Sequence, residues 1–116
     1  MQVVSLDQLP FSRIARELVG DDHGGLGVSL IFVEAPPGRG PSLHRHPYAE
    51  VFILQEGTAL FVAGDEEREA RGGDVVIVPA GTPHRFVNSG EGTLRQITIH
   101  LNSRFVTEWL ESAPVE

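Results

Sequence analysis

Short apolar runs, separated by glycine and proline, recur along the whole chain. Residues 27–34 and 75–78 are apolar on both faces, as strands inside a sandwich are, whereas residues 94–101 alternate between an apolar and a polar face. Shorter strands are expected at residues 68–70 and 84–88. The 13 glycines and 8 prolines fall mostly between these runs, which is typical of all-β sandwiches and barrels. The pattern therefore predicts an all-β protein.

The two ends of the chain follow a different pattern. The first twenty residues are ambiguous between a helical turn and edge strands. Residues 103–112 are predicted to form a short C-terminal helix, because Asn102 or Ser103 can cap it and because its apolar side chains recur with helical spacing. These side chains are Phe105, Val106, Trp109 and Leu110. We expect this helix to pack on the sandwich as a lid.

The stretch from Gly38 to Gly57 concentrates ionisable side chains between turn residues. If it is one extended strand, its even-numbered side chains point the same way. That face then holds His44, His46, Tyr48, Glu50, Phe52 and Leu54. The apolar members indicate that the face points inward, and a buried carboxylate is costly unless a cation or hydrogen bonds offset its charge. The pattern therefore predicts a cation or hydrogen-bond donors beside the carboxylate of Glu50.

A fourth ionisable side chain is expected to join this group. The bend built of Pro79, Gly81 and Pro83 is stiff and delivers His84 to the head of a strand. Imidazole nitrogen and carboxylate oxygen bind divalent metals at about 2.0–2.2 Å, and two histidines with one carboxylate form the site of non-haem iron oxygenases. Any one of these residues alone is more simply a surface residue. Together they indicate a metal site made of His44, His46, Glu50 and His84.

Candidate pocket residues follow from the expected faces of neighbouring strands. If Glu56 and Gly57 form a two-residue hairpin loop, Phe52 faces Phe61 and Glu50 faces Ala63. The polar face of residues 94–101 contacts substrate if it is interior and is solvated if it is exterior, and we favour the exterior by a small margin. The candidate pocket residues are Tyr48, Phe52, Phe61, Phe86 and, for an interior face, His100.

Composition excludes several classes of function. The chain has 116 residues, which fits one domain, and a net charge of −7 without a clustered basic face, so a nucleic-acid partner is not expected. It has no cysteine and no lysine, which excludes thiolate ligands and Schiff-base chemistry. No apolar run is long enough for a membrane span and no secretion signal is visible, so a cytoplasmic protein without a membrane partner is expected.

With these residues in view, the sequence resembles the cupins. The first cupin motif, G-x5-H-x-H-x3-E-x6-G, is met by Gly38, His44, His46, Glu50 and Gly57. The second motif, G-x5-P-x-G-x2-H-x3-N, is met by Gly73, Pro79, Gly81, His84 and Asn88. The resemblance implies a single domain over residues 1–116, folded as a small jelly-roll barrel or double-stranded β-helix. It also implies one divalent transition metal held by His44, His46, Glu50 and His84.

The metal decides which chemistry is open to such a site. Four protein ligands would fill the coordination sphere of tetrahedral zinc, whereas octahedral iron, manganese or nickel would keep two coordination positions free. The first hypothesis is a metal-dependent enzyme that acts on a small polar organic molecule in a dioxygenase-like or isomerase-like reaction, with Glu50 as a possible base. The alternative is a non-catalytic protein that binds or senses a small ligand or a metal, because the fold does not decide function.

A homodimer is also expected. Val51 and Ile53 are apolar but face away from Glu50, so they meet either a second layer of structure or another subunit. Cupins commonly pair, which favours the subunit interface.

Overall fold

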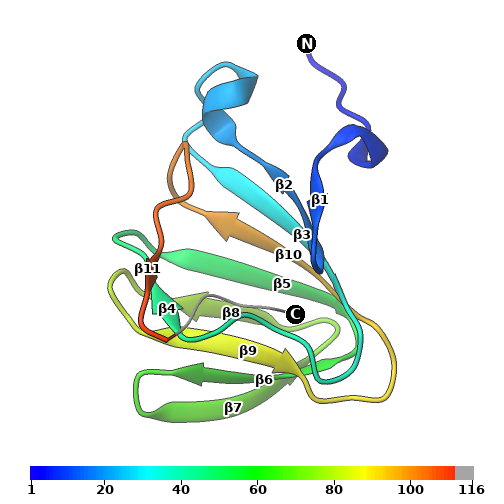
Figure 1. Cartoon of the computed structure of the whole chain (residues 1–116), viewed down its shortest axis with the longest axis vertical. Coiled ribbons are helices and arrows are strands. Elements are labelled where there is room, and N and C mark those ends of the chain that lie inside the picture. The colour runs from blue at the N-terminus through cyan, green and yellow to red at the C-terminus, as the bar shows by residue number, and fades with distance from the viewer. Residues whose placement is uncertain (112–116) are drawn as a thin grey trace.

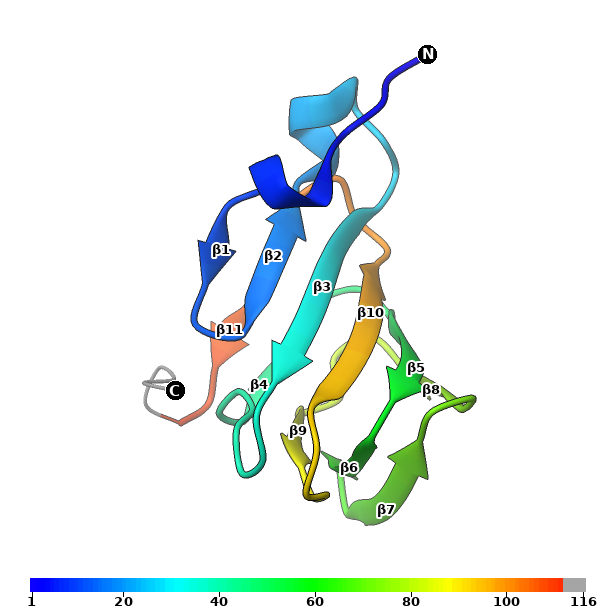
Figure 2. The ribbon, with the colours of Figure 1, turned by 90° about the vertical axis from the view of Figure 1, so that its right-hand side faces the viewer.

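The computed structural model describes residues 1–111 as two antiparallel sheets that face each other (Figures 1 and 2). The first sheet has the strand order β1-β2-β3-β10-β5-β8 and the second has the order β11-β4-β9-β6-β7. The strands are β1 (Phe11–Ser12), β2 (Ala15–Leu18), β3 (Ser29–Ala35), β4 (His44–Arg45), β5 (Glu50–Glu56), β6 (Thr58–Ala63), β7 (Glu66–Arg71), β8 (Val75–Val78), β9 (His84–Asn88), β10 (Leu94–His100) and β11 (Glu108–Trp109). Two 3-10 helices, η1 (Leu6–Gln8) and η2 (Gly20–His23), complete the described elements. The prediction of an all-β protein is confirmed.

The core lies between the two sheets and is built around three aromatic rings. Phe52 on β5 packs against Phe61 on β6 and Phe86 on β9, with ring centroids 5.0 and 5.9 Å away. All three side chains are buried, and burying each contributes about 1.5–3 kcal/mol. Because β5 belongs to one sheet and β6 and β9 to the other, this cluster joins the two layers.

The predicted hairpin at Glu56 and Gly57 is wrong. The chain leaves β5 in one sheet and enters β6 in the other, so Ala63 pairs with His84 and not with Glu50. Gly57 forms this corner with a φ of 87°, and a Cβ there would lie 2.7 Å from the carbonyl oxygen of Thr93. A corner between sheets and a hairpin loop have the same local turn chemistry, so the sequence did not distinguish them.

The placement of the polar face of β10 on the exterior is also wrong. Gln96, Thr98 and His100 are buried inside, whereas Ile97 and Ile99 are half-buried on the outer face. β10 lies between β3 and β5 in the middle of its sheet, and His100 is paired with Glu50. This pairing places His100 beside Glu50 in the interior, and the alternation along the strand places Thr98 and Gln96 on the same face.

The predicted C-terminal helix is absent from the described residues. Residues 103–111 run as an extended segment with the short strand β11, and residue 112 lies outside the described part of the chain. Figure 1 shows this segment, orange to red, passing from β10 to the side of β4. Its backbone bonds to other elements, since β11 pairs with β4 and the Leu110 N–H donates to the Leu43 carbonyl. These tertiary partners override the helical spacing of the apolar residues.

The ambiguous N-terminal region contains a hairpin. β1 and β2 pair so that Ser12 faces Ala15, which leaves Arg13 and Ile14 as a two-residue turn. Ile14 is buried in the core and anchors the turn against the inner faces of the sheets. Within residues 1–111, no helix is long and apolar enough to cross a membrane.

Candidate metal centre

Four ionisable side chains from both sheets meet at one end of the sandwich. His44 lies on β4, His46 follows it in a bend, Glu50 begins β5 and His84 begins β9. One potential ligand atom from each of the four lies within 4.8 Å of the others, and all four residues are buried. The structure therefore brings together the four residues singled out from the sequence.

His44, His46 and Glu50 do not lie on one continuous strand, as was assumed from the sequence. β4 ends at Arg45, and the chain bends and crosses to the other sheet before β5 begins at Glu50. His44 is paired with His84 across β4 and β9, and the Gly81 N–H donates to the His46 carbonyl at 2.8 Å. The turn before His84 thus supports both its own histidine and the bend that carries His46.

The backbone fixes the tautomer of three histidines in the same way. In each of them Nδ1 lies within hydrogen-bond distance of a main-chain carbonyl oxygen. The pairs are His44 with Ser42 at 2.7 Å, His46 with Val106 at 2.8 Å and His84 with Thr82 at 2.8 Å. A carbonyl oxygen only accepts, so Nδ1 carries the proton and a neutral ring presents the lone pair of Nε2. This is the arrangement in which histidine binds a metal through Nε2.

These lone pairs face the carboxylate of Glu50, which also only accepts. Nε2 of His84 and of His46 lie 3.0 and 3.1 Å from Glu50 Oε1, and the contact from His46 is not aligned as a hydrogen bond. Contacts between two acceptors at this distance are favourable only with a proton or a cation between them. The donor set, three imidazole nitrogens and one carboxylate, fits a divalent transition metal without modification.

The charge of Glu50 is held by its neighbours. Burial alone would raise the pKa of this carboxyl, but hydrogen bonds from the imidazoles of His100, His46 and His84 outweigh burial when their Nε2 atoms carry a proton, and they hold the pKa well below its usual range. Glu50 is only 3% exposed, so it is a buried anion surrounded by imidazoles. A cation bound among these rings would neutralise it.

Burial also perturbs His44. It lowers the pKa of this histidine from 6.5 to about 4, and the neighbouring rings of His84 and His46 lower it further against the opposing effect of the Ser42 carbonyl. His44 is therefore a neutral ligand candidate at neutral pH.

We expect the metal-free protein to lose stability on acidification. The unfolded chain protonates His44 near pH 6.5 and the folded chain only near pH 4, so the free energy of unfolding falls between these pH values by up to about 3 kcal/mol. Glu50, whose folded pKa is lowered, adds to the loss below about pH 4.5. Urea unfolding between pH 7 and 4 measures this slope, with His23→Gln as the control. A flat profile, or the same slope in His44→Gln, contradicts the assignment.

A fourth histidine beside Glu50, His100, has the opposite tautomer. Tyr48 accepts a hydrogen bond from the Val106 N–H at 3.2 Å, and its hydroxyl lies 2.7 Å from His100 Nδ1. Nε2 of His100 lies 3.0 Å from Glu50 Oε2, and this contact, like that of His46, is not aligned as a hydrogen bond. Because the Tyr48 hydroxyl accepts from Val106 and donates to Nδ1, the ring proton of His100 is on Nε2. His100 thus places a proton beside Glu50 and does not offer a lone pair to a metal.

A cavity of about 360 Å³ opens beside the cluster. Of the candidate pocket residues, Phe52, Phe86 and His100 line it. Tyr48 does not line the cavity and stacks on His46 with ring centroids 5.0 Å apart, and Phe61 does not line it either. The lining residues not singled out from the sequence come mainly from the β1–β2 hairpin and the C-terminal segment, and they include Arg13, Glu17, Phe105, Thr107 and Trp109.

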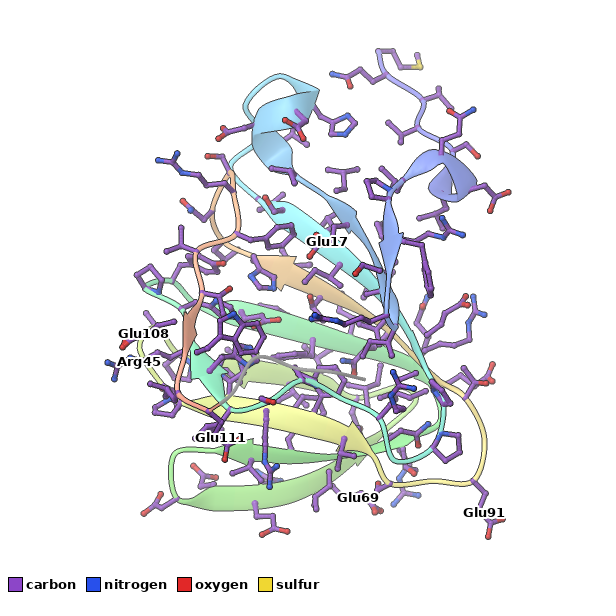
Figure 3. All side chains as sticks on the ribbon, in the orientation of Figure 1. Glu17, Arg45, Glu69, Glu91, Glu108 and Glu111 are labelled. Atoms are coloured by element: carbon purple, nitrogen blue, oxygen red, sulfur yellow. The ribbon has the colours of Figure 1, made fainter. Side chains whose placement is uncertain are left out.

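The C-terminal segment is fastened directly to the histidine cluster. The Val106 carbonyl accepts from His46, and Arg45 on β4 forms two hydrogen bonds of 2.9 Å with Glu108 on β11. Figure 3 shows this exposed ion pair at the left edge of the molecule. Phe105 packs edge-on against His100 at 4.8 Å, so the segment covers the cluster as the predicted lid would, but without a helix.

Asn88 supports the site from a distance. Its Nδ2 donates to the carbonyls of Ala35 and Gly92, and its Oδ1 accepts from the Gly90 N–H. It fixes the loop after β9 and lies outside the ligand cluster. Its role is that of a buried turn-stabilising side chain, as its residue type and position predict.

Fold and site together define a small double-sheet β protein with a buried cluster of three histidines and a glutamate. The family model described as a cupin domain matches residues 31–100. The chain belongs to the cupin family.

Similar proteins differ in size and in what their names say they do. An uncharacterized protein of Methanocaldococcus jannaschii is 32% identical over 71% of this chain and 67% of its own length. An auxin-binding protein of Prunus persica is 37% identical over 58% of this chain and 35% of its own. The solved structure of Bacillus subtilis oxalate decarboxylase superposes with a TM-score of 0.81 at 21% identity, over 92% of this chain and 31% of that one. The chain thus spans about a third of the plant protein and of the decarboxylase.

Proposed function

We propose that the chain binds one divalent transition metal through His44, His46, Glu50 and His84 and acts on a small polar organic molecule in the adjoining cavity. One observation carries the proposal. Three histidines have their Nδ1 protons committed to backbone carbonyls, so three Nε2 lone pairs converge with a buried carboxylate. A cation is the partner that this set of acceptors requires.

The protein residues would have distinct tasks in such a reaction. When bound, iron, manganese or nickel supplies open coordination positions and Lewis acidity, whereas zinc would be filled by the four ligands. Glu50 supplies the negative charge, and His100 holds that carboxylate in place through its Nε2 proton. Tyr48 fixes the tautomer of His100. Phe52 and Phe86 supply an apolar wall that excludes water from the cavity.

The cavity beside the cluster gives room for a small molecule in a catalytic protein and in a binding protein alike, so a reaction assay is needed to separate the two. The protein loaded with iron, manganese or nickel is incubated in D2O with catechols, diketones and hydroxy acids, while oxygen uptake and proton NMR are recorded. We expect oxygen uptake or deuterium incorporation with at least one compound, and loss of that signal in His46→Ala. If no compound gives oxygen uptake or deuterium incorporation but one of them binds tightly, the alternative of a non-catalytic binding protein is favoured. The name of the auxin-binding relative favours that alternative.

The proposal extends to a homodimer formed by the outer face of the first sheet. Aligned apolar residues cross this face in two rows. The first row is Ile77, Val51, Ile99, Leu30 and Leu18, and the second is Val75, Ile53, Ile97 and Phe32. All of them are at least partly exposed in the single chain. A patch that crosses five strands is larger than monomers usually expose, and a two-fold axis lets a second copy cover it with the same surface.

We expect Ile77→Glu to convert this dimer to a monomer. Ile77 is 68% exposed on the edge strand β8, so the folded chain tolerates the charge, but the interface would have to bury it. Size-exclusion chromatography with light scattering measures the mass, and Val3→Glu, at an exposed valine outside the face, is the control. A monomeric unsubstituted protein at high concentration would refute the dimer.

A further inference from the structure

The cavity beside the cluster contains a polar group that the four proposed ligands do not use. Thr98 lies two residues before His100 on β10, lines the cavity and is only 1% exposed. Its hydroxyl has no hydrogen-bond partner within residues 1–111 and almost no accessible surface. An unpaired buried hydroxyl is costly, so a ligand oxygen in the cavity would stabilise this position once the Thr98 side chain turns toward it.

An exposed arginine lies at the hairpin end of the same cavity. Arg13 lines the cavity from the β1–β2 turn, and it takes part in none of the ion pairs found within residues 1–111. Its φ is 60°, which makes it the one non-glycine residue with a positive φ in the described chain. Glycine suits this turn position without strain, whereas an arginine there carries a conformational cost. A strained, unpaired cation at the edge of a cavity points to recognition of an anion.

The strand register sets the order of these groups. Glu50 pairs with His100, Phe52 pairs with Thr98, and Leu54 pairs with Gln96. The last of these rows continues through Val33 to Ala15, next to the turn that holds Arg13. Four residues of strand span about 13 Å of backbone, so these rows place the ionisable cluster and the turn with Arg13 at different ends of the cavity.

The space between the two ends is mainly apolar. Ile31, Val33, Phe52 and Phe86 line it from β3, β5 and β9. Glu17 on β2 also lines the cavity and lies in the row of Ile31 and Thr98 (labelled in Figure 3). Its carboxylate disfavours a second anion in the middle of the cavity. An anionic group is therefore expected at the arginine end.

We infer that the ligand of this cavity is an organic acid with a short carbon chain, which lies between Arg13 and the ionisable cluster. Its terminal carboxylate pairs with Arg13, its carbon chain lies along the apolar wall, and an oxygen substituent meets Thr98. Its other end reaches the ionisable cluster. This inference rests on the proposed function only for that last contact.

Calorimetric titration with adipate and with 1,6-hexanediol tests the inference, because the two probes have equal chain length and differ in charge. We expect adipate to bind more tightly than the diol and Arg13→Gly to weaken adipate binding about 10- to 100-fold. Arg13→Gly should also raise the melting temperature, since it relieves the positive φ. Arg16→Gln removes the same charge from the hairpin at a residue that does not line the cavity, and it should leave adipate binding unchanged.

Thr98→Val provides a second readout. It removes the hydroxyl and nearly preserves the shape, so it should weaken 3-hydroxyadipate relative to adipate and leave the fold stable. Equal adipate affinity in Arg13→Gly and the unsubstituted protein overturns the inference, as does a diol that binds as tightly as adipate. Metal content is measured on the same samples. Arginine-dependent adipate binding by a protein that takes up no metal would support this inference and refute the proposed function.

Discussion

Glu50→Gln is expected to lower the affinity for a divalent transition metal at least about 100-fold, since loss of an outer partner of a ligand already costs 10- to 100-fold. Glutamine nearly preserves the shape of the side chain but removes its negative charge. Three neutral imidazoles would then have to hold a dication in a buried site without a counter-charge. His46→Ala should produce a loss of the same order, because it removes one Nε2 donor and releases the Val106 carbonyl.

A carboxylate in the same cavity supplies the matched control. Glu17 lines the cavity but lies outside the cluster, so Glu17→Gln should leave metal affinity nearly unchanged (Figure 3). Titration of chelator-treated protein with manganese, nickel and zinc gives affinity and stoichiometry for each variant. Unchanged affinity in both Glu50→Gln and His46→Ala would refute the proposed site.

Phe52→Ala is expected to destabilise the fold by about 3–5 kcal/mol. Phe52 is 1% exposed and its ring contacts Phe61, Phe86 and His84, so truncation leaves a cavity at the junction of the two sheets. The lost volume also lies behind His84, which would loosen one proposed metal ligand. The free energy of unfolding in urea measures the first effect, and metal affinity measures the second.

The same substitution at an exposed phenylalanine separates burial from residue type. Phe11 is 54% exposed on β1 and its ring lies under the Arg16 guanidinium at 5.2 Å. Phe11→Ala should therefore cost less than about 1 kcal/mol. A loss at Phe52 no larger than the loss at Phe11 would contradict the described core.

The ligand cluster was predictable because its determinants are local. His44 and His46 lie two residues apart in the chain, Glu50 follows within a few residues, and a proline- and glycine-containing turn precedes His84. These spacings survive even though the assumed single strand proved to be two strands in different sheets. The bend between them keeps the side chains close, so the four residues lie together although the assumed path of the chain was wrong.

The predictions that were wrong concern segments whose structure depends on partners that are distant in sequence. Alternation along residues 94–101 identified two faces of β10, but the pairing of His100 with Glu50 decides which face is interior. Helical spacing in residues 103–112 was outweighed by two hydrogen bonds to residues some sixty positions earlier: the Val106 carbonyl accepts from His46, and the Leu110 N–H donates to Leu43. No local pattern carries that information.

The sequence did not predict that the β1–β2 turn lines the cavity, for the same reason. Arg13 lies in a region whose secondary structure was ambiguous, and an arginine is not a typical residue for a left-handed turn position. Only the pairing of β2 with β3 brings this turn to the cavity.

X-ray absorption at the metal edge of the loaded protein tests the central claim most directly. We predict one metal per chain with a first shell of nitrogen and oxygen atoms at about 2.0–2.2 Å and the multiple-scattering pattern of three imidazoles. That pattern should weaken in His84→Ala and stay unchanged in His100→Asn, because the Nε2 of His100 carries a proton and faces Glu50. A spectrum without imidazole scattering, or one that His100→Asn alters as strongly as His84→Ala does, would contradict the account.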